Sequence, residues 1–386
     1  MQATWSTLLD EALTFRHQLH RQPELTWQEA HTARLIREAL TRLDIPWRPC
    51  AKYGTVATLA ADAKGEHIAL RGDIDALPIL EATDLSYRSE HAGCMHACGH
   101  DGHTAALWAT GAWLKSCEAQ LPGPVSLLFQ PAEEGGHGAR EMIADGALEG
   151  IDCIYGWHNW PAIPFGKAVC PDGAVMSGNG TFEITVRGRG GHASQPELCS
   201  NPVTAAAAIV VNLQQIISHR VAPQDAGVVA ITSIDAPSGP TIIPDTARLA
   251  GGIRLARPGM RAEFDRLIRQ ISKDTARTYG VEAEVDIQPR YEATINHPGP
   301  AQRFREGLAA EFGDDWRMAE LALPIMASED FSYYLDAIPG AFALIGMAQD
   351  GCFDIPCHSP RYQFNDALIA PVVRTFSRLV GVSPPG

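Results

Sequence analysis

Residues 95–103 read Met-His-Ala-Cys-Gly-His-Asp-Gly-His, so one thiol, three imidazoles and one carboxylate fall within nine residues. The glycines let the backbone bend between these side chains. An apolar helical pattern begins directly afterwards, at Thr104. A loop of this kind at a helix start is typical of segments that present metal ligands. A surface turn that happens to be rich in histidine is the alternative, and the rest of the chain decides between the two.

Acidic residues or histidine also follow three short apolar runs that the sequence predicts as strands. The runs and the side chains after them are 68–70 with Asp73 and Asp75, 125–129 with Glu133 and Glu134, and 151–155 with His158. Helical patterns lie between the runs, and strands that alternate with helices favour a mostly parallel sheet flanked by helices. Ligands collect at the carboxyl ends of the strands in such sheets, so we expect one crevice to gather these side chains.

The pattern of apolar and polar residues changes near Gly178. From there, alternating and helical patterns predict a strand, a helix, two strands, a helix and a strand, at 182–186, 201–218, 227–234, 246–254, 258–279 and 281–287. This order is the split pattern of a ferredoxin-like α+β domain. We therefore expect a catalytic domain that begins at 1–178, an inserted domain at 179–290, and a return to the catalytic domain at 291–386. In the catalytic domain we expect helices at 6–43 with a break at Pro23, at 104–117, at 301–312 and at 367–380, and a further strand at 341–345.

Length and composition set bounds on the class of protein. A chain of 386 residues is long enough for two domains, and 45% hydrophobic with 20% charged residues is typical of a globular protein. No apolar run has the length of a membrane span, and residues 1–10 lack a secretion signal, so we expect a cytoplasmic protein. The net charge of -14 argues against a nucleic-acid or anionic-membrane partner. Nine scattered cysteines do not form a disulfide framework.

The candidate metal ligands are spread over three of the segments above and one later segment. They are Cys98, His100, Glu134, His158 and His358. Neighbouring residues of an extended segment point in opposite directions, so Glu134 can bind metal while Glu133 faces the substrate as general acid and base. Thiolate, imidazole and carboxylate ligands together favour zinc first, with manganese, cobalt or nickel as alternatives. Five ligands exceed the four of a structural zinc site, which favours two divalent ions that share Glu134.

A thiol hydrolase is an alternative, with Cys98 as nucleophile and His100 as its base. That interpretation leaves both glutamates, His158 and His358 without a role. Four further polar residues are expected to support the ligands rather than to bind metal. They are Asp73, Asp75, Asp101 and His103.

Seven short strings, in order along nearly the whole chain, resemble a known family. They are Arg-Gly-Asp-Ile-Asp-Ala-Leu-Pro at 71–78, His-Ala-Cys-Gly-His-Asp-Gly-His at 96–103, Gln-Pro-Ala-Glu-Glu-Gly-Gly at 130–136, His-Asn-Trp-Pro at 158–161, Gly-Gly-His-Ala-Ser at 190–194, Ser-Glu-Asp-Phe at 328–331 and His-Ser-Pro-Arg-Tyr at 358–362. The chain is similar to the amidohydrolase branch of the aminoacylase and carboxypeptidase G metallopeptidase family. That branch includes hippurate hydrolases, indoleacetyl-amino-acid hydrolases and N-acetyldiaminopimelate deacetylases.

The resemblance implies two metals on the five ligands, Glu133 as the catalytic base, and cleavage of N-acyl amino acids to a carboxylate and a free amino acid. It also implies that the inserted domain is a lid and a dimerisation surface, from which His192 helps to hold the oxyanion. Arg254 matches an arginine that takes the substrate carboxylate. The alternative enzyme is a dipeptidase or carboxypeptidase-like hydrolase acting on short peptides. A catalytically silent amino-acid- or metal-binding protein is a hypothesis of another class, which the presence of Glu133 and of every ligand disfavours.

The chain departs from the usual family pattern at four places. Glu197 stands where relatives have histidine, Asn201 where they have aspartate, Thr241 where they often have asparagine, and Cys357 where they commonly have a first histidine before His358. None of these changes removes a metal ligand. The first three lie in the inserted domain, so they bear on substrate preference, and Glu197 in particular suggests a cationic or amine-bearing substrate.

Overall fold

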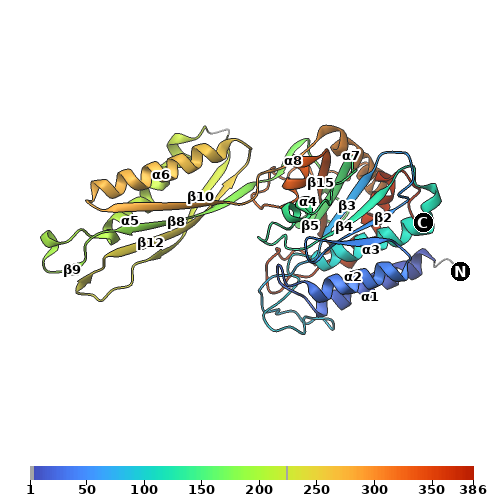
Figure 1. The fold of residues 1–386 in the computed structure, drawn as a ribbon, viewed down its shortest axis with the longest axis horizontal. Coiled ribbons are helices and arrows are strands. Elements are labelled where there is room, and N and C mark those ends of the chain that lie inside the picture. The colour runs from blue at the N-terminus through green and yellow to red at the C-terminus, as the bar shows by residue number, and fades with distance from the viewer. Residues whose placement is uncertain (1–3, 223–224) are drawn as a thin grey trace. The chain divides into compact units, whose positions relative to one another are not determined.

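The computed structural model describes residues 4–222 and 225–386, so the first three residues of the amino-terminal segment 1–10 lie outside the described part. The chain divides into two compact units, both visible in Figure 1. Unit 1 comprises Met1–Val175, Ile295–Ala322 and Asp330–Gly386, and unit 2 comprises Met176–Thr294 and Leu323–Glu329. The later segment of unit 2 was not foreseen, because the sequence places it with the returning catalytic domain.

Unit 1 is built on a seven-stranded sheet in the order β1-β2-β4-β3-β5-β15-β6. The strands are β1 (Trp47–Cys50), β2 (Gly54–Leu59), β3 (Ile68–Asp73), β4 (Val125–Gln130), β5 (Cys153–Pro164), β6 (Ala168–Val169) and β15 (Gly340–Ala348). The central strands β4, β3, β5 and β15 are parallel to one another, and the outer strands pair in the antiparallel sense. The predicted mostly parallel sheet is therefore confirmed.

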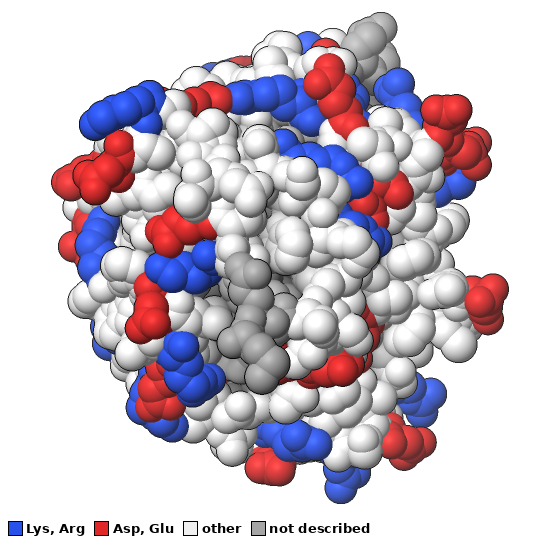
Figure 2. Space-filling view, turned by 90° about the vertical axis from the view of Figure 1, so that its right-hand side faces the viewer, with Lys and Arg blue, Asp and Glu red and all other residues white. Residues whose placement is uncertain are grey.

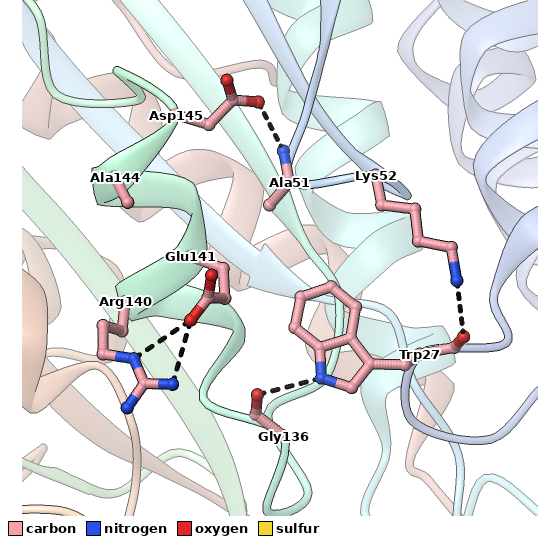
Figure 3. A pocket seen from close by; sticks show the side chains of 8 residues that line it. All are labelled: Trp27, Ala51, Lys52, Gly136, Arg140, Glu141, Ala144 and Asp145. Atoms are coloured by element: carbon pink, nitrogen blue, oxygen red, sulfur yellow. Dashed lines mark hydrogen bonds and ion pairs between the residues drawn. The ribbon is translucent and has the colours of Figure 1, made fainter.

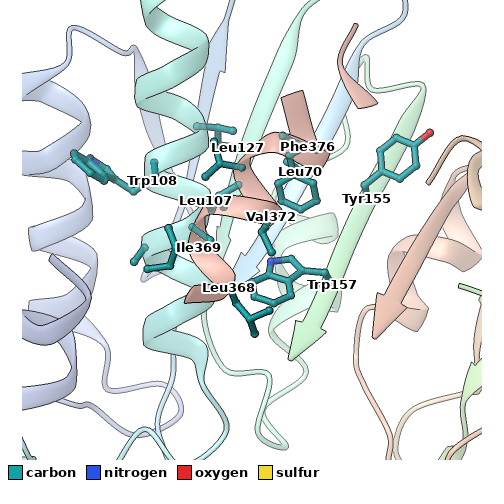
Figure 4. Close-up of a cluster of buried hydrophobic side chains, with 14 of the residues drawn as sticks. Leu70, Leu107, Trp108, Leu127, Tyr155, Trp157, Leu368, Ile369, Val372 and Phe376 are labelled. Atoms are coloured by element: carbon teal, nitrogen blue, oxygen red, sulfur yellow. The ribbon is translucent and has the colours of Figure 1, made fainter. Parts of the chain in front are cut away.

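Helices flank this sheet, as Figure 1 shows. They are α1 (Trp5–Arg21), α2 (Ala30–Arg42), α3 (His100–Ser116), α4 (Gly138–Ala144), α7 (Pro298–Phe312), α8 (Ser332–Ala337) and α9 (Ile369–Leu379). Helix α3 packs against α1, α9 and β3. Figure 4 shows the resulting core, in which Leu107 of α3, Leu127 of β4 and Val372 of α9 are buried. Burying such a side chain contributes about 1.5–3 kcal/mol, so this layer fixes the start of α3.

Two boundaries differ from the predictions in ways that affect the site. Helix α3 begins at His100 rather than at Thr104, so His100 and His103 lie in its first turn and not in a loop. Strand β5 continues to Pro164, so His158 lies within a strand rather than after its carboxyl end. The strand extends because β15 pairs with it past the point where its pairing with β3 stops, and His158 stands opposite Leu344.

Unit 2 is a four-stranded antiparallel sheet with two helices. Its sheet has the order β10-β12-β8-β13. The elements are β8 (Gly178–Arg187), α5 (Pro202–Leu213), β10 (Gly227–Asp235), β12 (Thr246–Leu255), α6 (Met260–Thr278) and β13 (Glu282–Pro289). Alternate residues of β8, such as Phe182 and Ile184, are buried in a separate core with residues of α5 and α6. The element order is the β-α-β-β-α-β order that the sequence predicts.

Short elements complete the description. In unit 2 these are β9 (Gly191–His192), a 3-10 turn at Pro196–Leu198, a π-helical turn at Ile216–Arg220 and β11 (Ile242–Ile243). The others are β7 (Gly173–Met176), β14 (Thr294–Asn296) and 3-10 turns at Glu118–Gln120 and Asp366–Leu368. Within the described residues, no helix has the length and apolar character needed to cross a membrane. On the face shown in Figure 2, acidic and basic side chains are interspersed, unlike the continuous basic surface of a nucleic-acid-binding protein.

Candidate metal centre

The five side chains predicted as ligands meet in one place in unit 1. The potential ligand atoms of Cys98, His100 and His158 lie within 4.8 Å of one another, and those of Cys98, Glu134 and His358 form a second group of the same size. His100 also groups with Glu133 and Glu134 within that distance. Cys98 and Glu134 each belong to two groups, so the structure links all of these side chains into one cluster.

Gly99 brings Cys98 and His100 into the cluster. Its φ is +93°, a left-handed conformation that glycine adopts without strain, and it immediately precedes α3. A Cβ atom at this position would lie 2.3 Å from Oδ1 of Asn159 and 2.6 Å from the Tyr362 hydroxyl. Glycine is therefore required both for the backbone angle and for the close packing around the helix start.

Backbone carbonyls fix which nitrogen of each buried histidine faces the centre. His100 Nδ1 lies 3.0 Å from the carbonyl oxygen of Asp75, and His158 Nδ1 lies 2.6 Å from that of Asn159. In both residues Nδ1 donates the hydrogen bond, which leaves Nε2 as the ligand atom. His158 Nε2 is 3.4 Å from Cys98 Sγ. Burial and the neighbouring His103 lower the pKa of His158 well below its usual range, so this ring is neutral, as a metal ligand must be.

The two glutamates lie in a turn and not in the extended segment that the sequence suggests. Ala132 has a φ of +56°, and Glu133, Glu134 and Gly135 form a turn. The turn directs both carboxylates toward His100, whereas an extended chain would have pointed them apart. Glu133 is 6% exposed, and its Oε1 accepts a hydrogen bond of 3.4 Å from the Asp330 amide.

His358 completes the cluster from the loop after β15. Its φ is +67°, and its amide donates a 2.8 Å hydrogen bond to the carbonyl oxygen of Ala97. This bond ties the His358 loop to the Cys98 segment. His358 Nε2 lies 3.2 Å from Glu134 Oε1, and its side chain is 53% exposed, which leaves one side of the centre open to solvent.

The cluster has the properties of a cation site. His100 Nε2 is buried and has no hydrogen-bond partner among the described residues. Burial alone would lower the pKa of His100, but the charges of Asp73, Asp75 and Glu134 raise this pKa to about 10. His100 Nε2 also lies 3.6 Å from Asp73 Oδ2, and thiol, imidazole and carboxylate donors surround it. Such a set of donors fits divalent metal ions of the zinc type.

The expected supporting residues divide into two sets. Asp75 contacts the ligands, because its Oδ1 lies 3.3 Å from His100 Nδ1 and its Oδ2 accepts a 2.9 Å hydrogen bond from the Glu134 amide. His103 bridges Asp73 Oδ1 at 2.6 Å and Asn159 Oδ1 at 2.7 Å.

Asp101 serves a different contact. It pairs with Arg16 at 3.1 Å and with His20 at 2.8 Å, and so joins the start of α3 to α1.

Two buried polar residues of this region were missed from the sequence. Arg71, which follows the apolar residues 68–70 within strand β3, binds Asp73 at 2.7 Å and Asp330 at 3.1 Å. Glu29 accepts a 2.9 Å hydrogen bond from the amide of Ala132, next to the turn that contains Glu133 and Glu134. A charged residue directly after an apolar run was the available signal for Arg71. No such signal was available for Glu29, because this residue precedes a helical pattern that is typical of a surface helix.

Asp73, His100 and His103 form a further group with metal-ligand spacing. Both Asp73 oxygens are already engaged, one with Arg71 and the other with His103. This carboxylate therefore supports the histidines and is not a candidate ligand.

His192 and Arg254 lie in unit 2, and the cluster in unit 1 does not include them. His192 is exposed on β9, where its Nδ1 accepts a hydrogen bond of 3.1 Å from the Ser194 amide. Arg254 is on β12, and burial together with nearby Arg290 lowers the pKa of its guanidinium.

A separate hollow of about 540 Å³ lies beside the turn that contains Glu133 and Glu134, and Figure 3 shows its lining. Trp27 Nε1 donates a 3.0 Å hydrogen bond to the carbonyl oxygen of Gly136, and Lys52 Nζ lies 3.5 Å from the carbonyl oxygen of Trp27. The hydrogen bond from Trp27 holds the segment at Gly136 in place. None of the candidate ligands lines this hollow. The hollow is therefore not the metal centre.

Comparison with known proteins agrees with this geometry. A model of the peptidase family M20/M25/M40 matches residues 69–381. The IAA-amino acid hydrolase ILR1-like 2 of Arabidopsis thaliana is 35% identical over 367 residues, which cover 94% of this chain and 82% of that protein. N-acetyl-L-cysteine deacetylase of Bacillus subtilis is 36% identical over 370 residues, which cover 94% of this chain and 86% of that protein.

A solved structure extends the similarity to the fold. It is a Bacillus subtilis protein described as a dinuclear metal binding peptidase from the M20 family, with a TM-score of 0.83 and 30% identity over 97% of this chain and 98% of that one. The family match covers most of the chain, and the relatives cover nearly all of it. The chain therefore belongs to the peptidase family M20/M25/M40, and it is a hydrolase of amide bonds.

Proposed function

We propose that the protein cleaves the amide bond of N-acyl amino acids to a carboxylic acid and a free amino acid. The observation that carries this proposal is the single cluster of Cys98, His100, Glu134, His158 and His358 with Glu133 beside it. The names of the relatives, an IAA-amino acid hydrolase and an N-acetyl-L-cysteine deacetylase, support the same substrate class.

The five ligands would hold two divalent ions, zinc first, with manganese, cobalt or nickel as alternatives. Glu134 belongs to two of the ligand groups, and it would be the ligand that the two ions share. When bound, the ions supply Lewis-acid polarisation of the amide carbonyl and lower the pKa of water. Glu133 takes a proton from water and delivers it to the leaving amine. Asp75 and the carbonyl of Asn159 hold the two buried imidazoles in the orientation that binding requires.

Unit 2 is proposed to act on the substrate as a lid. Arg254 would bind the carboxylate of the amino acid, since a guanidinium matches a carboxylate in shape and charge. His192 would donate a hydrogen bond to the oxyanion, a contribution worth roughly 3 kcal/mol. Glu197 lies in an exposed turn of the same unit and would favour a cationic or amine-bearing side chain. If Glu197→His leaves the ranking of substrates by side chain unchanged, this role of Glu197 is wrong.

The protein is also proposed to form a homodimer through unit 2 and to work in the cytoplasm. Strand β10 lies at an edge of the sheet within the described residues, and Ile234 on it is 57% exposed. Val211 of the adjoining helix α5 is 69% exposed. An edge strand beside exposed aliphatic residues is a surface that a second copy can cover.

The experiment that tests the reaction is amine release from a panel of N-acyl amino acids and dipeptides, with added zinc or manganese and then with chelator. We expect release from one acyl class, with loss of activity in chelator. Release from dipeptides alone would replace the proposal by a dipeptidase. Absence of release from every substrate by the metal-loaded protein would favour a silent binding protein.

A further inference from the structure

Strand β5 continues past His158 and presents a tryptophan on the same face. Alternate residues of a strand point to the same side of a sheet, so Trp160 and Ala162 follow His158 on that side. His158 is 4% exposed, Trp160 is partly exposed and Ala162 is exposed. The face that carries the ligand therefore opens to solvent within four residues, and Trp160 stands where it opens.

The neighbouring strands leave the indole of Trp160 uncovered. Strand β3 pairs with β5 only as far as Tyr155. On the other side, the residue of β15 opposite Trp160 is Gly346, which has no side chain. Within the described residues, Trp160 packs on the core of neither unit, whereas Phe165, just after the same strand, packs on the main core. Core packing therefore does not account for an indole at this position.

The indole instead contacts the ring of a candidate metal ligand. The ring centroids of Trp160 and His158 are 6.1 Å apart, and the two rings meet edge to face at 70°. Sites for small molecules are lined mostly by apolar and aromatic side chains, with a few polar groups that fix the orientation of the ligand. A partly exposed indole beside the metal centre fits the apolar part of such a lining.

We propose that Trp160 is the wall on which an aromatic acyl group packs, so that the hydrolase prefers N-arylacetyl and N-aroyl amino acids to N-acetyl amino acids. The inference rests on the proposed function, because the acyl group lies beside Trp160 only when the amide carbonyl is bound at the ligand cluster. The amino acid part of the substrate carries the carboxylate and, through Glu197, the proposed cationic side chain. The acyl group is the uncharged part, and an aryl ring packs well on an indole, either stacked or edge to face.

The kinetic test compares N-phenylacetyl and N-acetyl derivatives of the same amino acid, with glycine and then lysine as that amino acid. Trp160→Ala should lower kcat/KM for the phenylacetyl substrates about 10–100-fold and change it less than about threefold for the acetyl substrates. Its zinc content should equal that of the wild type. Trp47→Ala is the matched control, because Trp47 is 38% exposed on the edge strand β1, and it should change neither ratio.

Three kinetic results would overturn the proposal. An unchanged kcat/KM for the phenylacetyl substrates would show that the ring does not touch the acyl group. An equal loss for both acyl groups would show that Trp160 acts only by supporting His158. A loss that follows lysine rather than the acyl group would place the cationic side chain on the indole instead. Absence of release from every substrate by the wild type would contradict the proposed reaction, and the binding measurement then decides the role of Trp160.

The binding measurement needs no turnover and uses the zinc-loaded, full-length protein labelled with 5-fluorotryptophan. The fluorine resonance of Trp160 is the one that disappears in Trp160→Phe. Phenylacetate should shift this resonance, and acetate at the same concentration should not. Because the wild type itself is observed, the result holds even if Trp160→Ala does not fold. A resonance that phenylacetate leaves in place, or that acetate shifts equally, would overturn the proposal.

Discussion

Asp75 holds two of the candidate ligands at once, although it is not itself a candidate metal ligand. One carboxylate oxygen lies 3.3 Å from His100 Nδ1, and the other accepts hydrogen bonds of 2.9 Å from the Glu134 amide and from the Thr26 hydroxyl. The orientation of an imidazole and the position of a glutamate thus depend on one buried carboxylate. Partners of this kind affect metal affinity without touching the metal.

Asp75→Asn is expected to weaken metal binding roughly 10–100-fold. Both carboxylate oxygens of Asp75 face hydrogen-bond donors, whereas the asparagine side chain has one oxygen acceptor and one NH2 donor, so one of these hydrogen bonds is lost. Competition with a fluorescent chelator measures the affinity. The exposed Asp84→Asn is the matched control and should bind metal as the wild type does. Equal affinities for the two variants would show that Asp75 is not a positioning residue.

Glu29 makes a pH-dependent contribution to stability. Burial, together with the charge of Asp75, raises the pKa of Glu29 from 4.5 to about 8. Because the folded-state pKa lies above the unfolded one, the proton stabilises the folded protein at low pH, and this contribution decreases as the pH rises from about 4.5 through 8. In chelator, Glu29→Gln should therefore lose less stability than the wild type across this window, as urea unfolding at several pH values can measure. Parallel profiles would contradict the prediction.

At the scale of elements, the start of α3 decides whether Cys98 and His100 reach the same centre. Gly99 has a left-handed φ and no room for a Cβ atom. Gly93 has a similar φ of +81°, but a Cβ atom added there would have nothing within 4 Å, so it provides a matched comparison.

Gly99→Ala should lower the free energy of unfolding by about 2–4 kcal/mol, from left-handed strain and overpacking together. Gly93→Ala should cost only about 1–2 kcal/mol, from the backbone alone. Thermal unfolding of both variants measures the difference. A smaller loss in Gly99→Ala than in Gly93→Ala would be inconsistent with the packing at Asn159 and Tyr362.

The elements also show how far the sequence predicts this site. Apolar runs located β3, β4 and part of β5, because buried parallel strands have a strong local pattern. The local pattern did not predict the turn at Glu133, which depends on the φ of Ala132 and on Glu29 from a distant segment. It also missed the length of β5, which pairing with β15 sets. Long-range hydrogen bonds leave no signal in a local pattern.

At the scale of the whole molecule, the chain consists of a metal-centre unit and a unit with its own core. We expect the wild type to sediment as a dimer and the double variant Val211→Glu, Ile234→Glu to sediment as a monomer, because each change places a charge on the proposed interface. Tyr279→Glu, at an exposed position beyond α6, is the control and should remain dimeric. A wild type that stays monomeric at high concentration would refute the dimer.

The central claim is metal-assisted hydrolysis with Glu133 as the proton carrier, and Glu133→Gln tests it most directly. The variant should bind as much metal as the wild type by elemental analysis while its kcat on the best N-acyl amino acid falls roughly 10²–10⁴-fold. Glu141→Gln, at a half-buried position away from the ligands, should change neither quantity. An unchanged kcat in Glu133→Gln with metal fully bound would contradict the mechanism.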